Sequence, residues 1–168
     1  GLKWSKVLMN MLGNATSAIL GEPPDVVFAN KQMVDIEIDA WREAFAVMHA
    51  AEIPPANVGK YAFSQWAPII RHAPKWVLRP ILRSQVSSGR GGKMPSLYLD
   101  LDKGKPHNEV EWLNGAIAKR GREVGVRTPI NTMLTEVLME IVHKADKREL
   151  WRGNLLRLQV TADEYRER

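Results

Sequence analysis

The 168-residue sequence contains no cysteine. It therefore has no disulfide framework, no thiolate nucleophile and no zinc site built on cysteine. No apolar run approaches the roughly 20 residues that a membrane-spanning helix needs. The chain also lacks the charged start and apolar block of a secretory signal peptide. These absences favour a protein of the reducing cytoplasm with no membrane partner.

Signatures of metal and nucleic-acid binding are also scarce. The four histidines are far apart and have no carboxylate at a typical metal-ligand spacing, so we expect no metal site. The net charge of +5 is compatible with an anionic partner but does not require nucleic acid. Hydrophobic residues make up 45% and charged residues 26% of the chain, which is typical of one globular domain.

Glycines and prolines divide the chain into a series of helices. We predict a first helix from about Trp4 to Leu20, ended by Gly21, and a second helix from about Lys31 to Glu52. In the second helix, apolar residues recur at intervals of three and four and mark a core-facing stripe: Val34, Ile38, Trp41, Phe45 and Met48.

The middle of the chain is less regular. Pro68, Pro74 and Pro80 predict short helical pieces, and a loop is expected over residues 87–92. The alternating residues 97–101 fit either a short strand or the first turns of a helix entered after a proline.

Capping residues mark the later helices. Asn108 can cap a helix that runs to Val124, with Glu111 at the capping-box position. Thr128 can cap the next helix, whose first residue is a proline. A final, more polar helix is interrupted at Gly153. The sum is an all-α fold of six or seven helices that forms a single domain.

The predicted first helix carries a narrow polar stripe on an otherwise apolar surface. On a helical wheel of 100° per residue, the whole stripe lies within roughly 80° of Lys6. Its members are Lys6, Asn10, Gly13, Asn14 and Ser17. Asparagine is a poor helix former, so two asparagines four residues apart beside a lysine need an explanation. A small polar ligand lying along the stripe would supply one. A buried hydrogen-bond network or a solvent-facing stripe would supply another.

Two further residues carry candidate chemistry. Ser96 lies at an expected helix start, where its hydroxyl and nearby N–H groups could hold a carboxylate, although serine after proline is also ordinary capping. Glu109, in the first turn of its helix, is favourable for the helix macrodipole alone. Separately, neither residue is specific.

Together these segments resemble a known family. They are Trp4–Asn14, Pro95-Ser96 with Asp100, Asn108–Gly115 and Gly125–Asn131, and the similarity extends from Trp4 to about Val142. In order and approximate spacing they are similar to the C-terminal domain of ketopantoate reductases (2-dehydropantoate 2-reductases). The resemblance implies a compact helical fold like that of 6-phosphogluconate dehydrogenase-like proteins.

The resemblance implies a two-domain enzyme that reduces a 2-keto acid with NADPH, ketopantoate to pantoate in pantothenate biosynthesis. An N-terminal Rossmann domain would bind the cofactor, and Lys6 would be the general acid that protonates the carbonyl oxygen. Asn10 and Asn14 would bind the substrate's hydroxyl and carbonyl oxygens. Ser96 would bind its carboxylate, and Glu109 would orient the substrate and Lys6. A homodimer is expected, because an apolar rim left open without the cofactor domain favours self-association.

Other features depart from a complete enzyme of this family. Pro23-Pro24 stand where the family often has another polar substrate contact. The sequence has no G-x-G-x-x-G fingerprint after a strand, so we expect the NADPH-binding domain to be absent from this chain. The opening Gly1-Leu2-Lys3-Trp4, with no Met and no cap residue, leads us to expect a fragment.

A competing interpretation comes from the basic segment, residues 60–93. This segment contains seven basic residues and no acidic one, with two interleaved tryptophans. Bases interleaved with aromatics can bind nucleic acid or an anionic membrane surface, which would make the chain a non-catalytic binding module. A solvated face with the tryptophans packed beneath it explains the same pattern. So does a surface that faces the missing domain or the phosphates of the cofactor.

Overall fold

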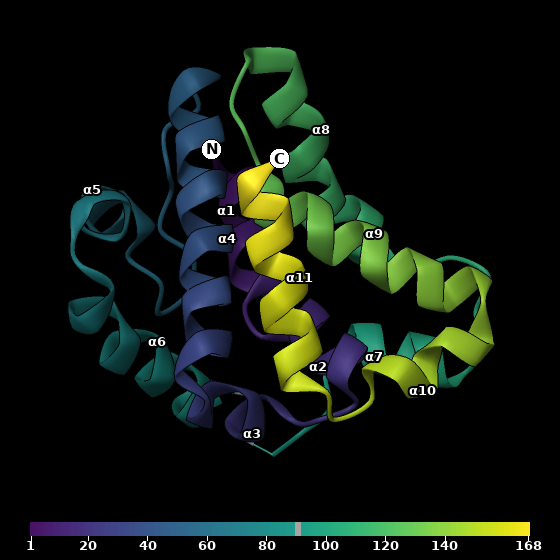
Figure 1. The fold of residues 1–168 in the computed structure, drawn as a ribbon. Helices are drawn as coiled ribbons and strands as arrows, with labels where there is room; N and C mark the ends of the chain where they lie inside the picture. The colour runs from purple at the N-terminus through teal and green to yellow at the C-terminus, as the bar shows by residue number, and fades with distance from the viewer. Residues whose placement is uncertain (90–91) are drawn as a thin grey trace.

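The computed structural model describes residues 1–89 and 92–168, which form helices joined by loops (Figure 1). The α-helices are α1 (Leu2–Met11), α2 (Asn14–Leu20), α3 (Pro24–Ala29), α4 (Lys31–Ala50), α5 (Phe63–His72), α6 (Lys75–Gly89), α7 (Ser96–Asp102), α8 (Asn114–Val124), α9 (Pro129–His143), α10 (Arg148–Trp151) and α11 (Leu155–Glu167). Two short 3₁₀ helices are η1 (Glu109–Trp112) and η2 (Ala145–Lys147). Within the described ranges, β-type pairing is limited to an isolated bridge between Val58 and Tyr61. The all-α fold class is confirmed, with more and shorter helices than expected.

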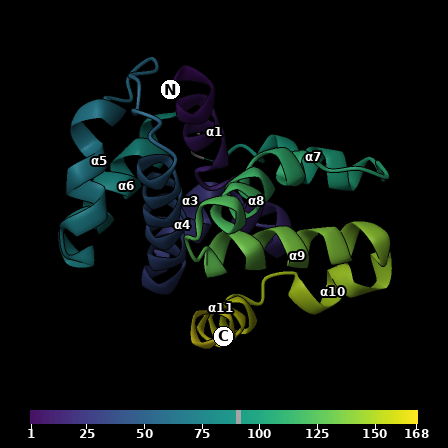
Figure 2. The ribbon, with the colours of Figure 1, turned by 90° about the horizontal axis from the view of Figure 1, so that it is seen from above.

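Helix α4 occupies the centre of the molecule. Figure 2 shows it between α5 and α6 on one side and α8 and α9 on the other, with α1 and α11 at opposite edges. All five residues of the predicted apolar stripe on α4 are buried. The spacing of apolar residues therefore identified the central helix correctly, because a helix covered on every side must bury its apolar face.

An aromatic cluster fills the core beside α4. The Trp41 ring meets Phe45, Tyr61 and Phe63 edge to face, with ring centroids 6.5, 6.5 and 5.5 Å away. The Trp41 indole Nε1 also donates a hydrogen bond to the Leu8 carbonyl at 3.1 Å. This bond satisfies the polar edge of the buried ring and fastens α1 to α4.

The prolines of the middle region interrupt the helices less than predicted. Pro68 lies inside α5 and Pro80 inside α6, whereas Pro74 separates these two helices. Helix α6 extends over residues 87–89, where a loop was expected, and residues 90–91 lie outside the described part. A proline inside a helix removes one backbone hydrogen bond, a loss that the packing of α5 and α6 against α4 offsets.

Residues 97–101 form part of α7, so the strand alternative is wrong. The buried residues of this helix are Leu97 and Leu101, whereas Leu99 between them is exposed. A spacing of four places two side chains on the same helical face, and a spacing of two does not. The alternating pattern therefore contained a helical face of only two buried residues, Leu97 and Leu101.

The helix predicted over residues 108–124 is divided into η1 and α8. Asn108 caps as expected, because its side chain accepts a hydrogen bond from the Val110 N–H at 3.0 Å, but the turn that it caps is η1. The backbone leaves the helical region at Leu113, with φ −103° and ψ −97°, and α8 begins at the next residue.

Part of the basic segment faces α4 instead of solvent. Arg79 forms two hydrogen bonds to the Asp35 carboxylate at 2.7 and 3.0 Å, and Lys75 pairs with Asp39 at 3.0 Å. Trp76, expected beneath a solvated face in one interpretation, is instead 72% exposed. Because acids of α4 neutralise these two cations, they are not free to bind nucleic acid. This pairing weakens the binding-module interpretation.

The N-terminus of α9 is capped by a carboxylate from α4. Glu43 accepts hydrogen bonds from the N–H groups of Ile130 and Asn131 at 2.8 and 2.9 Å, and from the Asn131 side chain at 2.7 Å. Thr128, the predicted cap, makes no side-chain capping bond, and its hydroxyl lies 3.4 Å from that of Thr132. Burial raises the pKa of Glu43 from 4.5 to about 7, against the opposing effect of these hydrogen bonds.

Glu43 makes the stability of the domain depend on pH. A carboxyl whose pKa is higher in the folded than in the unfolded protein binds protons preferentially in the folded state. The free energy of unfolding therefore falls as pH rises from about 4.5 to about 7. Relative to Glu43→Gln, which does not titrate, we expect the wild type to lose on the order of 1 to 3 kcal/mol between pH 5 and pH 8. Urea unfolding of both proteins at the two pH values measures this difference, and parallel pH profiles would contradict it.

Candidate functional site

The polar stripe is shared between two helices, because the predicted first helix breaks at Leu12-Gly13. Gly13 has φ +67°, a conformation that glycine adopts at little cost, and α2 begins at the next residue. A Cβ atom at Gly13 would lie 3.1 Å from the Phe28 ring of α3. The break leaves α2 buried along its whole length, whereas Lys6 and Asn10 of α1 are exposed.

A buried carboxylate holds this break in place. Glu37 of α4, which is 2% exposed, accepts hydrogen bonds from the Gly13 N–H at 3.0 Å and from the Thr16 hydroxyl at 2.7 Å. Both donors lie at the start of α2, where backbone N–H groups lack helical partners. Sequence reasoning missed Glu37, because α4 also carries Asp35, Asp39 and Glu43 and the sequence does not show which of these acids is buried.

Asn14 joins α2 to α7. Its amide nitrogen donates hydrogen bonds to the Asn10 carbonyl at 3.0 Å and to the Ser96 hydroxyl oxygen at 3.3 Å. Its amide oxygen accepts from the Leu97 N–H at 3.2 Å. The structure thus brings together Asn10, Asn14 and Ser96, the last two of which are 82 residues apart in sequence. Both amide hydrogens of Asn14 are used within the protein, whereas the exposed Ser96 hydroxyl can still donate outward.

Glu109 is connected to the start of α7 through its neighbour Asn108. The Asn108 side chain donates to the Leu97 carbonyl at 3.2 Å and also caps η1, which contains Glu109. The Glu109 side chain is exposed. A hydrogen bond to Asp100 raises the pKa of Lys105, and the nearby charge of Glu109 adds to this effect.

Lys6 lies one helical turn before Asn10 on the same face of α1. Its side chain is exposed and makes no hydrogen bond or ion pair within the described part of the chain. Likewise, no hydrogen bond or ion pair between Lys6 and Glu109 is found among the described residues. Four of the five candidate side chains are exposed, and Asn14 is buried. The exposed candidates therefore lie on the surfaces of α1, α7 and η1.

The comparison with models of protein families shows to which family the chain belongs. The model of the ketopantoate reductase PanE/ApbA C-terminal domain matches residues 1–142. The chain belongs to this family. Within the described residues, no helix has the length and hydrophobicity to cross a membrane, and no cluster of three or more acidic or histidine side chains is arranged to hold a metal ion.

Two solved structures share the fold of this member of the ketopantoate reductase family. One is a PanE/ApbA family ketopantoate reductase from Ralstonia eutropha JMP134, with 23% identity, a TM-score of 0.64 and coverage of 87% of this chain and 41% of that chain. The other is D-mandelate dehydrogenase with NADH and anilino(oxo)acetate, with 21% identity, a TM-score of 0.65 and coverage of 85% and 68%. The chain thus spans less than half the length of the Ralstonia reductase. A search of curated protein sequences gave no match.

The break at Gly13 is open to a direct test. Gly13→Ala forces a left-handed backbone on a residue with a Cβ and also presses that Cβ against Phe28, so we expect a loss of about 2 to 3 kcal/mol in unfolding free energy. Gly125→Ala is the matched control, because Gly125 has φ +73° but open space around its Cβ position. This control isolates the backbone cost of about 1 kcal/mol. Urea unfolding measures both losses, and equal losses would show that the contact with Phe28 is unimportant.

Proposed function

We propose that this chain is the substrate-binding and proton-donating part of a nicotinamide-dependent reductase that converts a 2-keto acid, ketopantoate in the first instance, to a 2-hydroxy acid. The observation that carries the proposal is the hydrogen bond between Asn14 and Ser96, which brings α7 beside the polar face of α1 and α2. Family membership supports the reaction class. The anilino(oxo)acetate in the mandelate dehydrogenase structure, which has an oxo group beside a carboxylate, supports the substrate class.

Each polar residue has a role that its position permits. The Ser96 hydroxyl donates to the substrate carboxylate, and the exposed Asn10 amide binds the substrate's hydroxyl or carbonyl oxygen. Asn14 holds Ser96 in place and retains one lone pair on its amide oxygen for a substrate hydroxyl. Glu109 orients the substrate and Lys6 from the η1 side.

Lys6 supplies the proton in this proposal. Reduction of the carbonyl carbon leaves an alkoxide on the oxygen, and the Lys6 ammonium transfers a proton to that oxygen to form the hydroxyl. The neutral amine then regains a proton from water. Because Lys6 is exposed here, the exclusion of water that strengthens such a transfer has to come from outside this chain.

The hydride donor would be NADPH, held by an N-terminal Rossmann domain outside this sequence. Two observations support this division. The described residues contain no strand that could begin a dinucleotide-binding unit, and the sequence has no G-x-G-x-x-G. The chain also spans only 41% of the solved ketopantoate reductase. We therefore assign the dinucleotide mainly to the Rossmann domain, and the substrate and the proton to the residues of this chain.

Lys6→Ala tests the mechanism in the full-length protein. We expect kcat for 2-keto acid reduction to fall by about 10² to 10⁴, the usual contribution of a positioned general acid. The fold should be unchanged, because the Lys6 side chain is exposed. Lys144→Ala removes a similarly exposed lysine at the end of α9 and should leave kcat within about twofold. Near-normal turnover of Lys6→Ala would exclude this mechanism.

The apolar side chains around the open site provide a second test, on the isolated chain. Leu2, Leu99 and Trp112 are 53%, 46% and 74% exposed on α1, α7 and η1, the three elements that carry the exposed candidate residues. We propose that the Rossmann domain covers them and that the 168-residue chain alone self-associates through them as a two-fold dimer.

Sedimentation velocity over a range of concentrations measures this association. Trp112→Ser should weaken it, whereas Trp76→Ser, which removes a tryptophan of 72% exposure on α6, should not. A chain that stays monomeric at tens of micromolar would contradict the proposal.

A further inference from the structure

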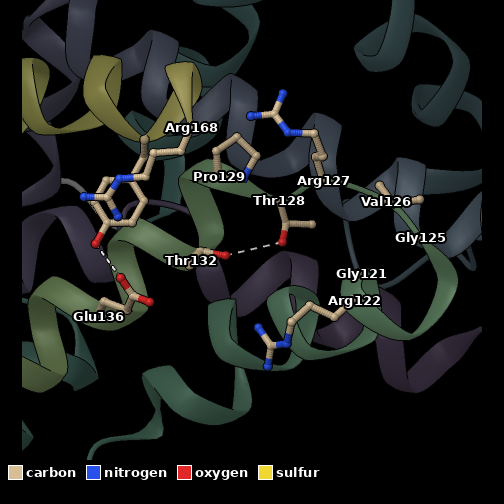
Figure 3. Close-up of a pocket in the computed structure, with 11 residues that line it drawn as sticks. Gly121, Arg122, Gly125, Val126, Arg127, Thr128, Pro129, Thr132, Glu136 and Arg168 are labelled. Carbon is tan, nitrogen blue, oxygen red and sulfur yellow. Dashed lines mark hydrogen bonds between the residues drawn. The ribbon is translucent and has the colours of Figure 1, made fainter.

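A cavity of about 510 Å³, open to solvent, lies between the end of α8, the loop that precedes α9 and the end of α11 (Figure 3). It is separate from the candidate reductase site. In Figure 2, α1 and α11 lie at opposite edges of the molecule, with α4, α8 and α9 between them. None of the five candidate reductase residues lines this cavity.

Three arginines from different segments line the cavity. Arg122 comes from the last turn of α8, Arg127 from the following loop and Arg168 from the residue after α11. Figure 3 shows their side chains on three sides of the hydroxyl groups of Thr128 and Thr132. Arg122 and Arg127 are close in sequence, whereas Arg168 reaches the cavity because it follows α11.

None of these arginines forms an ion pair with a carboxylate within the described residues. Arg127 donates to the Arg166 carbonyl at 3.2 Å, and the Arg168 guanidinium lies 3.9 Å from the centre of the Tyr165 ring. The side chain of Arg122 makes no hydrogen bond in the described part of the structure. The carboxylate in the lining, Glu136, accepts a hydrogen bond from the Tyr165 hydroxyl.

Five of the nine other arginines in the described ranges do pair with a carboxylate. Arg79, Arg148 and Arg166, for example, each contact an aspartate. Guanidinium groups gathered around one cavity repel each other unless an anion lies between them. The lining of the cavity therefore carries three guanidinium groups against one carboxylate, that of Glu136, and its net charge is positive.

We propose that this cavity binds a small organic anion with at least two oxyanion groups, either phosphates or carboxylates. Planar guanidinium groups bind both kinds of oxyanion through paired hydrogen bonds. One of the two threonine hydroxyls donates to the other, and the second keeps its hydrogen for a ligand. Val126 and Pro129 form an apolar part of the wall that can contact the carbon skeleton of the ligand. The volume lies in the range of small-molecule sites. This proposal does not rest on the proposed reductase function.

Calorimetric titration of the 168-residue chain with inorganic pyrophosphate, and separately with citrate, tests the site at about 0.15 M salt. We expect saturable binding of at least one of the two at one molecule per chain. Pyrophosphate alone would identify a phosphorylated ligand, and citrate alone a polycarboxylate. Arg122→Gln and Arg127→Gln should each raise Kd about tenfold, as expected for the loss of a charged hydrogen-bonding partner.

Arg120→Gln is the matched control. It removes the same charge from the same helix, but Arg120 pairs with Glu123 at 2.8 Å and does not line the cavity. Its Kd should change by less than about twofold. Circular dichroism confirms that each variant keeps its helices. If neither anion binds saturably, or if Arg120→Gln weakens binding as much as Arg122→Gln, the proposed site does not exist.

Discussion

Carboxylates along α4 bind the donors of four neighbouring helices. Asp35 pairs with α6, Glu37 accepts from the start of α2, Asp39 pairs with α6 and with Arg166 of α11, and Glu43 caps α9. Apolar burial drives these helices together without specifying their direction. Hydrogen bonds to a carboxylate do fix the direction in which a neighbouring helix lies. Removing the donors of a partly buried carboxylate would strongly destabilise the fold. The arrangement of the domain therefore depends on where α4 places its acids.

The candidate site follows from this arrangement. Glu37 fixes the backbone at Gly13, the break there turns Asn14 inward, and Asn14 binds the start of α7 at Ser96. This series of contacts ends at Ser96, which is exposed. Lys6, on the neighbouring helix α1, is exposed as well. In the proposed reductase, the proton donor and the hydroxyl would lie on an open surface. A second domain would then have to exclude water from them.

The basic residues of the chain differ in whether the fold pairs them with acids. Those of α6 that contact α4 are used within the fold, where Lys75 and Arg79 neutralise the acids of the central helix. Three arginines around the cavity beside α8 and α11 form no ion pair with a carboxylate in the described part of the chain: Arg122, Arg127 and Arg168. A density of basic residues in the sequence is therefore a poor guide to binding, because charge that is already paired attracts no ligand.

The all-α fold class, the central helix and the family could be predicted from the sequence. The spacing of apolar residues predicted α4, glycines predicted the ends of α2 and α8, and the short motifs predicted the family, because each of these signals is local. The break at Gly13 and the capping of α9 by Glu43 were not readable, because each depends on a partner far away in the chain. For the same reason, only the tertiary structure could show that Asn14 bonds to Ser96 and that three unpaired arginines share one cavity. Local periodicity determines which helices form, and the long-range hydrogen bonds of buried polar groups decide how they are placed.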